Sequence, residues 1–268
     1  MADRSLFLSD LDETLLTRDK RITERTRKAL DDFAERGGVF AISTGRPLMS
    51  AEEVCRTMEL DYPGSYIVSF NGALITEAHG GGEVYRAGIA IDDAFEIMDM
   101  ADRRGIYIQA YRGPYILAKE YNEHSAHYIS FIHCPLIIFR DIKKEMTEPP
   151  CKLLAIDADR EKLTALRDEI AEKLGDRTKM AFSSRSYLEI FSKEAGKGRA
   201  LRYLAKYLGI PEERTYAAGD MENDMEMIEM AGTGIAMING ADKIKAAADV
   251  VTEEDNNHDG LAKYIDAM

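Results

Sequence analysis

The beginning of the chain alternates short apolar runs with longer segments in which apolar residues recur at helical spacing. The runs predict buried strands at Leu6–Ser9, Val39–Ser43 and Tyr66–Phe70, and the spacing predicts helices at Thr23–Glu35 and Leu48–Met58. Strands that alternate with helices are typical of parallel βαβ units. This part of the sequence therefore predicts an α/β fold with a doubly wound parallel sheet.

The middle of the chain follows a different pattern, which begins with a hairpin predicted around Gly80–Gly82. Paired short strands then alternate with helices, and this indicates a separate α+β module. Its expected elements are helices at Asp92–Arg104, near Asn122–His133 and at Arg160–Leu174, and strands at Tyr107–Tyr111, Tyr115–Ala118, Lys152–Asp157 and Thr178–Phe182. A strand at Tyr187–Phe191 follows.

The alternation of strand and helix then returns and continues to the end. The expected elements are helices at Gly198–Leu208, Asp242–Ala248 and Gly260–Ala267, and strands at Thr215–Ala218, Thr233–Met237 and Asp249–Thr252. We therefore expect a discontinuous α/β core of residues 1–86 and 187–268, interrupted by an inserted module of residues 87–186.

Composition and charge narrow the class of protein. The 268 residues are 45% hydrophobic and 31% charged, as in ordinary globular proteins, and the formal net charge is −13. Such a charge repels polyanions, so we expect no nucleic-acid partner. No apolar run approaches the roughly 18 residues of a membrane span, and the apolar stretch near the N-terminus is too short for a signal peptide. We expect no membrane association and a cytoplasmic location.

Polar side chains follow the predicted strands at four places. In chain order they are Asp10 and Asp12, then Thr44-Gly45-Arg46, then Lys197-Gly198, then Gly219-Asp220 with Asn223 and Asp224. Open α/β sheets bind ligands beyond the carboxyl ends of their strands. We therefore expect these groups to converge at one edge of one sheet.

Each group meets a need of phosphoryl transfer. Carboxylates that lie close together require a cation, and their hard oxygens suit Mg²⁺, for which Asp10, Asp220 and the backbone carbonyl of Asp12 are the natural ligands. An ionised aspartate can act as the nucleophile, and Asp12 can protonate the leaving oxygen and later deprotonate water. The Thr44 hydroxyl and the Lys197 ammonium can hold the phosphoryl oxygens.

These residues stand in strings that resemble the motifs of the haloacid dehalogenase superfamily, and most of all those of its Cof-type (class IIB) phosphatase branch. The strings are Asp10-Leu11-Asp12-Glu13-Thr14-Leu15-Leu16, Ser43-Thr44-Gly45-Arg46-Pro47, Asn71-Gly72-Ala73, Lys197-Gly198 and Gly219-Asp220-Met221-Glu222-Asn223-Asp224. Two later stretches, residues 234–241 and 257–261, are similar to the same branch. The resemblance spans nearly the whole chain.

The resemblance implies a Rossmann-like core with a type-2 cap inserted between the second and third motifs. It implies that Asp10 is the nucleophile and a metal ligand, and that Asp12 is the acid/base and binds metal through its backbone. The other implied roles are phosphate binding by Thr44 and Lys197, metal binding by Asp220 with support from Asp224, and a substrate pocket that includes Gly45, Asn71 and Asn223. Arg46 also matches a residue of the family, and two roles stay open for it, substrate binding and a structural role. In this family the cap selects the leaving group, for which the candidate contacts are Tyr111, Arg112, Tyr115, Tyr121, His124 and His127.

One position departs from the family pattern. Glu13 stands where glycine is usual, so it must either adopt an ordinary backbone conformation or carry some strain. The function expected from the residues and the resemblance is Mg²⁺-dependent hydrolysis of a small phosphorylated metabolite through an aspartyl-phosphate. Two alternatives stay open: a phosphotransferase or mutase that uses the same phospho-aspartate, and a ligand-binding protein without catalysis.

Overall fold

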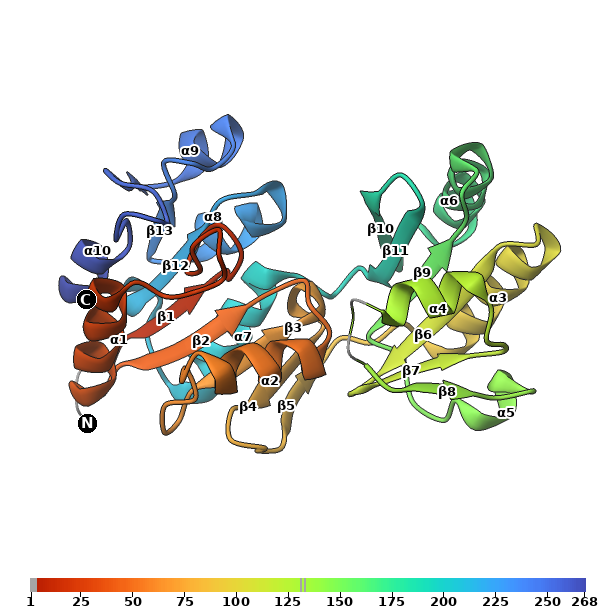
Figure 1. Ribbon diagram of the computed structural model, residues 1–268, viewed down its shortest axis with the longest axis horizontal. Coiled ribbons are helices and arrows are strands. Elements are labelled where there is room, and N and C mark those ends of the chain that lie inside the picture. The colour runs from red at the N-terminus through yellow and green to blue at the C-terminus, as the bar shows by residue number, and fades with distance from the viewer. Residues whose placement is uncertain (1–3, 131, 133) are drawn as a thin grey trace. The chain divides into compact units, whose positions relative to one another are not determined.

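A computed structural model describes residues 4–130, 132 and 134–268. The chain forms two compact units, which are coloured along the chain in Figure 1. The first comprises the chain up to Arg46 together with Ala51–Tyr85 and Gly196–Met268, and the second comprises Pro47–Ser50 and Arg86–Ala195.

The described part of the first unit contains an eight-stranded sheet in the order β14-β13-β12-β1-β2-β3-β4-β5. Its strands are β1 (Leu6–Ser9), β2 (Val39–Ser43), β3 (Tyr66–Ser69), β4 (Leu74–Glu77), β5 (Glu83–Arg86), β12 (Thr215–Gly219), β13 (Thr233–Ala236) and β14 (Val250–Val251). The strands from β14 to β3 pair in parallel, and β4 runs antiparallel to β3. The doubly wound α/β core predicted from the sequence is confirmed.

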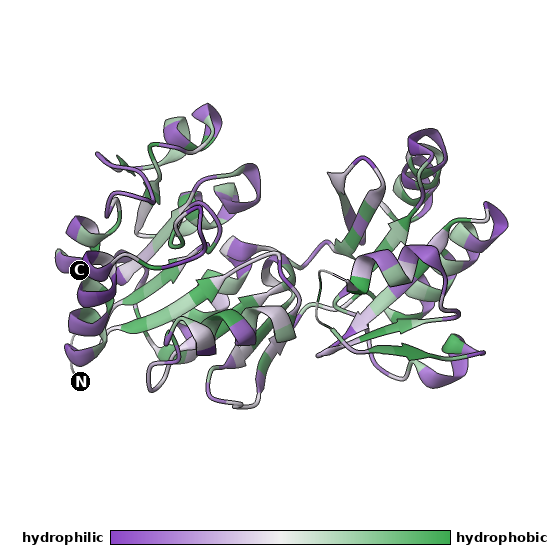
Figure 2. Cartoon of the chain, in the orientation of Figure 1, coloured by the Kyte–Doolittle hydropathy of each residue, from purple (hydrophilic) through white to green (hydrophobic). Residues whose placement is uncertain are grey.

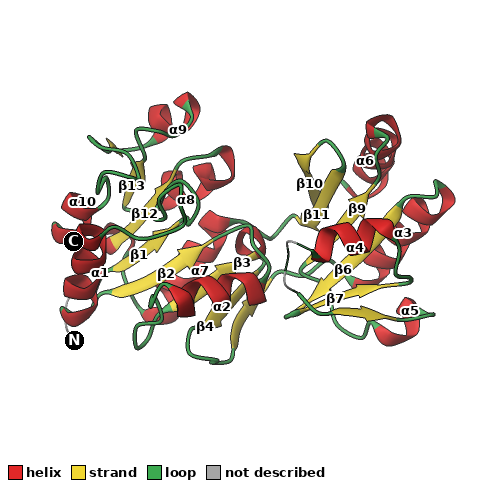
Figure 3. Ribbon diagram, in the orientation of Figure 1, coloured by secondary structure: helices red, strands yellow, loops and turns green. Residues whose placement is uncertain are grey.

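Helices cover both faces of this sheet, as Figure 3 shows. They are α1 (Glu24–Glu35), α2 (Leu48–Thr57), α7 (Lys197–Leu208), α8 (Met225–Met230), α9 (Asp242–Ala247) and α10 (Ala262–Asp266). On one face Phe33 of α1 packs edge-on against Phe7 of β1, with ring centroids 6.3 Å apart. On the other face, residues of α7 and α8 share an apolar cluster with alternate residues of the central strands. The strands are the hydrophobic layer of the molecule (Figure 2), because burial on both faces favours continuous apolar runs.

The pairing register places the functional loops at one edge of the sheet. β1 lies between β2 and β12, and Ser9 at its carboxyl end is opposite both Ile42 and Ala218. Parallel strands end at the same edge, so the residues that follow β1, β2 and β12 begin side by side.

The described residues of the second unit are built around a six-stranded mixed sheet in the order β10-β11-β9-β6-β7-β8. Its elements are strands β6 (Tyr107–Arg112), β7 (Tyr115–Ala118), β8 (Leu136–Ile138), β9 (Lys152–Ile156), β10 (Thr178–Ser184) and β11 (Tyr187–Ser192), and helices α3 (Ile91–Arg103), α4 (Glu123–Ile129), α5 (Ile142–Glu145) and α6 (Arg160–Leu174). Helices α3 and α6 pack on one face through an apolar cluster. Lys152 is buried in this unit and pairs with Glu189 at 3.1 Å.

The structure differs from the predicted elements in three places. The strand expected at Tyr187–Phe191 is β11, and it pairs with β9 and β10, so it is part of the second sheet and not of the first. The second unit accordingly extends to Ala195, beyond the boundary that we expected at residue 187. The short elements β8 and α5 were not predicted. Residues 131 and 133, inside the helix expected near 122–133, lie outside the described residues. Among the described helices, none is long and apolar enough to cross a membrane.

Candidate active site

Asp10 is the first residue after β1, and its buried carboxylate contacts the first turn of α7. The backbone amide of Asp10 continues the sheet ladder by donating to the Ala218 carbonyl of β12 at 2.9 Å. The Lys197 ammonium, fully buried, donates to Asp10 Oδ1 at 2.6 Å and to Asp224 Oδ1 at 2.5 Å. One lysine therefore links the loop after β1 to the loop after β12.

Asp10, Asp220 and Asp224 form an acidic cluster. Each of them offers one carboxylate oxygen, and these oxygens lie within 4.8 Å of one another. The second oxygen of Asp224 accepts from the backbone amides of Asp220 and Met221 at 3.1 Å each. This turn is tight enough that a Cβ on Gly219 would lie 2.4 Å from the Asp224 side chain, so glycine is required there.

The cluster carries more negative than positive charge. Three carboxylates face the ammonium of Lys197. Burial raises the pKa of Asp10 from 3.8 to about 7, even though Lys197 lowers it, and burial raises the pKa of Asp220 to about 6. Burial lowers the pKa of Lys197, but its carboxylate partners outweigh that effect and leave the pKa above its usual value. A divalent cation would balance the excess negative charge, and this donor set of carboxylate oxygens suits a hard metal ion.

The side chain of Asp12 is 39% exposed, whereas Asp10, Asp220 and Asp224 are buried. Arg46 donates to both of its oxygens, from Nε at 3.0 Å and from Nη2 at 2.8 Å, and Lys20 donates to Oδ1 at 2.8 Å. Burial raises the pKa of Asp12, but the hydrogen bonds from Arg46 and Lys20 outweigh it and hold the pKa below 3.8. Arg46, predicted to bind substrate, therefore has the Asp12 carboxylate as its partner in this structure.

The loops after β2 and β3 are tied together. The Thr44 amide donates to the Val68 carbonyl at 2.8 Å, and the Asn71 amide donates to the Thr44 carbonyl at 2.9 Å. The Asn223 amide nitrogen donates to Asn71 Oδ1 at 3.3 Å. Gly45 lies against the same asparagine, because a Cβ there would be 3.1 Å from Asn71 Oδ1. The predicted residues Thr44, Gly45, Asn71 and Asn223 are thus connected through contacts around Asn71.

The element that positions Lys197 differs from the one that we expected. We expected it to follow a strand of the same sheet, but the preceding strand β11 belongs to the second sheet. Lys197 is instead the first residue of α7, preceded by Gly196 as the N-cap. The start of α7 packs closely against the turn after β3, because a Cβ on Gly72 would lie 2.1 Å from the Gly196 carbonyl oxygen.

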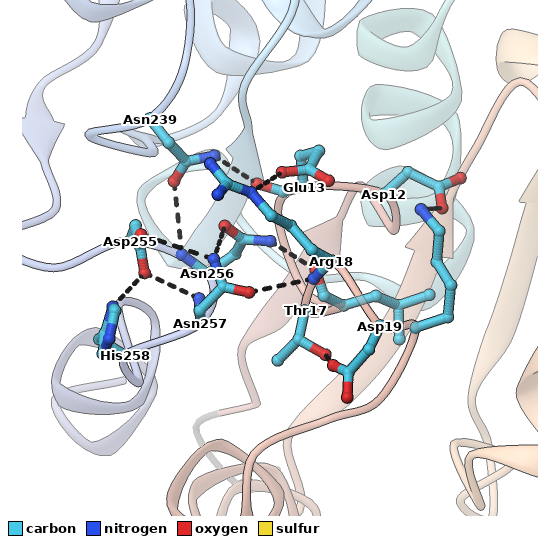
Figure 4. A network of polar contacts seen from close by, with 12 residues as sticks. Asp12, Glu13, Thr17, Arg18, Asp19, Asn239, Asp255, Asn256, Asn257 and His258 are labelled. Carbon is cyan, nitrogen blue, oxygen red and sulfur yellow. Dashed lines mark hydrogen bonds and ion pairs between the residues drawn. The ribbon is translucent and has the colours of Figure 1, made fainter.

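Several residues that support the site were not predicted from the sequence. Thr14 donates to Asp220 Oδ1 at 2.9 Å, and Lys20 binds Asp12. Asn239 donates to the Glu13 carbonyl at 2.8 Å, within the network that Figure 4 shows. Thr14 and Asn239 stand within strings quoted above, but nothing local identifies their partners. Glu13 has a φ of 60°, so at this position it takes the left-handed conformation that glycine adopts at lower cost.

The candidate contacts in the second unit are unevenly exposed. Tyr111 is buried, and its hydroxyl accepts from the Gln109 amide at 3.0 Å, so it is an interior residue of this unit. Tyr115 and Tyr121 are exposed. His124 stands in the first turn of α4, with its ring centroid 6.0 Å from that of Tyr107.

The chain is similar to known proteins over nearly its whole length. A family model described as haloacid dehalogenase-like hydrolase matches residues 7–265. The chain belongs to this family. The 5-amino-6-(5-phospho-D-ribitylamino)uracil phosphatase YitU of Bacillus subtilis is 30% identical over 271 residues, which cover 97% of this chain and 96% of YitU.

Solved structures of the haloacid dehalogenase family agree over the whole chain. A haloacid dehalogenase-like hydrolase from Bacteroides thetaiotaomicron matches with a TM-score of 0.86 and 26% identity, covering 98% of each chain. The subclass IIB sugar phosphatase BT4131 matches with a TM-score of 0.76 and 21% identity, covering 98% of each chain, and shows the same fold. The resemblance to the Cof-type, class IIB branch is confirmed, and the second unit is its cap domain.

Proposed function

We propose that this haloacid dehalogenase-type phosphatase hydrolyses small phosphorylated metabolites with Mg²⁺, through a phosphoryl group carried on Asp10. The observation that carries the proposal is the buried cluster in which Lys197 joins Asp10 and Asp224 beside Asp220. Burying charged groups is costly unless they are paired, and such perturbed carboxylates typically mark functional sites.

The carboxylates of Asp10, Asp220 and Asp224 are the residues that would hold Mg²⁺, together with the backbone carbonyl of Asp12. Their excess of negative charge and their hard oxygen donors fit this ion. When bound, Mg²⁺ supplies positive charge that keeps Asp10 ionised and offsets the charge of a phosphoryl group.

The protein's own residues then divide the chemistry. An Asp10 carboxylate oxygen attacks phosphorus, the ester P–O bond breaks, and Asp12 gives a proton to the leaving oxygen. In the second step Asp12 takes a proton from a water molecule that attacks the phosphorus, and inorganic phosphate leaves Asp10. Thr44 and Lys197 hold the phosphoryl oxygens, with Gly45, Asn71 and Asn223 around them, and Asp224 fixes the Lys197 ammonium.

Arg46 serves to orient Asp12 in this proposal. Its guanidinium binds both carboxylate oxygens, a geometry that fixes the direction of a side chain better than a single bond. Because proton donation requires Asp12 to be protonated, the hydrogen bonds from Arg46 and Lys20 must weaken when substrate is bound.

The substrate class follows from the family and its cap. The similar YitU protein is named for a phosphorylated ribityl compound, so we propose a small, polyhydroxylated phosphomonoester as substrate. Core residues fix the reaction, and the cap residues distinguish the leaving groups.

Phosphate release tests the proposal. Purified protein with Mg²⁺ should release inorganic phosphate from p-nitrophenyl phosphate and from members of a panel of phosphorylated sugars, sugar alcohols and nucleotides. A chelator should abolish the release. The Asp10→Asn variant should lower kcat by at least about a thousandfold, since the nucleophile is absent. Asp19→Asn changes an exposed carboxylate later in the same connection between β1 and α1, and it should retain the wild-type kcat.

Three outcomes would contradict the proposal. One is no phosphate release from any ester when Mg²⁺ is present. Another is an Asp10→Asn variant with the wild-type rate. The third is cleavage of the ester that requires an added acceptor sugar and yields a phosphorylated sugar in place of inorganic phosphate, which would indicate a phosphotransferase.

A further inference from the structure

The loop that carries Asp12 is held in an unusual shape. Directly after Asp12, Glu13 has a φ of 60°, a left-handed conformation that is unfavourable for a residue with a side chain. The loop then closes on itself, because the Leu16 amide donates to the Leu11 carbonyl at 2.8 Å. A shape that is locally unfavourable persists only when surrounding groups hold it.

Three asparagines from the end of the chain bind this loop (Figure 4). The Asn239 amide nitrogen donates to the Glu13 carbonyl at 2.8 Å, and the Asn256 amide nitrogen donates to the Leu16 carbonyl at 2.8 Å. Asn257 Oδ1 accepts from the Arg18 backbone amide at 3.0 Å.

The three asparagines are also connected with one another. The Asn256 backbone amide donates to Asn239 Oδ1 at 3.3 Å, and the Asn257 amide nitrogen contacts Asn256 Oδ1 at 3.3 Å. Asp255 anchors the segment by accepting from the Asn257 backbone amide at 2.9 Å. The set therefore binds the loop as one unit, and its contacts go mostly to the backbone, so that they fix the path of the chain.

We propose that Asn239, Asn256 and Asn257 form a clamp that positions Asp12 for proton transfer. They are positioning residues, since they touch the backbone of the Asp12 loop and not the reacting atoms. The clamp rests on the proposed function for the role of Asp12, while its hold on Glu13 rests on the hydrogen bonds alone. It gives a function to the segments after β13 and β14, which the reaction itself leaves unused.

The atoms of each asparagine suggest a matched pair of variants. Asn239 acts on the loop as a donor, so Asn239→Asp keeps the shape but places an oxygen against the Glu13 carbonyl. Asn257 acts on the loop as an acceptor, so Asn257→Asp keeps its bond from the Arg18 amide and loses only contacts of 3.3 and 3.5 Å. Both variants add one negative charge.

The readout is the dependence of kcat/KM on the leaving group. The p-nitrophenolate ion leaves without a proton, whereas an alkoxide requires one from Asp12. We expect Asn239→Asp to lower kcat/KM for an alkyl phosphate by about tenfold or more, and for p-nitrophenyl phosphate by clearly less. Asn257→Asp should lower kcat/KM for either ester by less than Asn239→Asp lowers it for the alkyl phosphate.

A second substitution tests the hold on Glu13. Glycine adopts the left-handed conformation without strain, so Glu13→Gly should restore much of the alkyl phosphate activity of Asn239→Asp. In urea denaturation, Glu13→Gly should also stabilise the Asn239→Asp protein more than it stabilises the wild type. If Asn239→Asp fails to fold, Asn239→Ala, which adds no charge, takes its place in both measurements.

The clamp is overturned if Asn239→Asp lowers kcat/KM equally for both esters, or if Asn257→Asp lowers kcat/KM for the alkyl phosphate as much as Asn239→Asp does. It is also overturned if the effects of Glu13→Gly and Asn239→Asp on the free energy of unfolding are additive. A wild-type protein that is inactive on both esters would refute the proposed function instead. The denaturation comparison would then still decide whether the asparagines hold Glu13.

Discussion

At the scale of single residues, the hydroxyl of Thr14 shows how a neutral group tunes the acidic cluster. Thr14 is buried and donates to Asp220 Oδ1 at 2.9 Å. Burial raises the pKa of Asp220 to about 6, and the Thr14 hydrogen bond is the first effect that opposes it. The hydroxyl therefore favours the ionised form that a metal ion needs, and it also fixes the direction of the carboxylate.

Removing this hydroxyl should weaken metal binding. We expect Thr14→Val to raise the Mg²⁺ concentration for half-maximal activity by about tenfold or more, because partners of metal ligands typically contribute 10- to 100-fold to affinity. Thr14→Ser keeps the hydroxyl and is the control. Titration of phosphatase activity with Mg²⁺ measures the effect, and equal Mg²⁺ requirements for the valine and serine variants would contradict it.

At the scale of elements, two loops that approach closely set the start of α7. Gly72 has a φ of +89°, and a Cβ on it would lie 2.1 Å from the Gly196 carbonyl oxygen and 2.8 Å from the Lys197 nitrogen. Lys197 is the first residue of α7, so the packing of these loops determines where its ammonium lies. The turn after β3 is in this way part of the machinery that places the lysine.

A pair of glycine substitutions separates this steric effect from backbone strain. Gly37 has a similar φ of +86°, but a Cβ there would meet nothing within 4 Å. We expect Gly37→Ala to lower the free energy of unfolding by about 1 kcal/mol through strain alone. Gly72→Ala should cost several times more and should also reduce kcat. Urea denaturation and phosphate release measure both quantities, and equal costs for the two variants would show that the close approach is unimportant.

At the scale of the whole molecule, the net charge of −13 must coexist with an anionic substrate. The described structure resolves this conflict locally, by gathering Lys197 with carboxylates that a cation can neutralise. Without metal, the raised pKa values of Asp10 and Asp220 mean that the folded protein binds protons more tightly than the unfolded chain. Between pH 4 and about 7, the stability that these two carboxyl groups contribute to the metal-free protein should therefore fall as the pH rises.

Magnesium should reverse this trend. Because the ion competes with protons for Asp10 and Asp220, its binding should strengthen as the pH rises through about 6 to 7. We expect the rise in Tm on adding Mg²⁺ to be larger at pH 7.5 than at pH 5.5. Differential scanning calorimetry with and without the ion measures it, with Asp220→Asn as the control in which the rise is small at both values. A Tm rise independent of pH would contradict this assignment.

Several site residues could be predicted from the sequence because their positions depend on local sequence patterns. Asp10 follows a buried apolar run, and Asp220 and Asp224 lie four residues apart in one turn. Parallel strands end at a common edge, so these positions could be predicted to meet before any side-chain contact was known.

Other parts depend on loop shape and strand pairing, which the sequence pattern does not encode. The contacts of Arg46 with Asp12 and of Asn239 with Glu13 join positions far apart in the chain. Strand β11 has the same apolar pattern as a core strand, and only its pairing with β9 and β10 assigns it to the cap sheet. Elements as short as β8 and α5 give too few residues for a periodicity to be recognised.

The order of strands in the first sheet has a consequence for synthesis on the ribosome. β1 emerges early, yet its neighbour on one side is β12, which begins at Thr215. At roughly 5–20 residues per second, that edge of β1 stays without its native partner for tens of seconds. The cap, by contrast, is nearly continuous in the chain and has its own apolar cluster, so it can finish folding in that interval. A nascent chain released early would carry a complete cap and an open strand beside Asp10, a species prone to aggregate and unable to react.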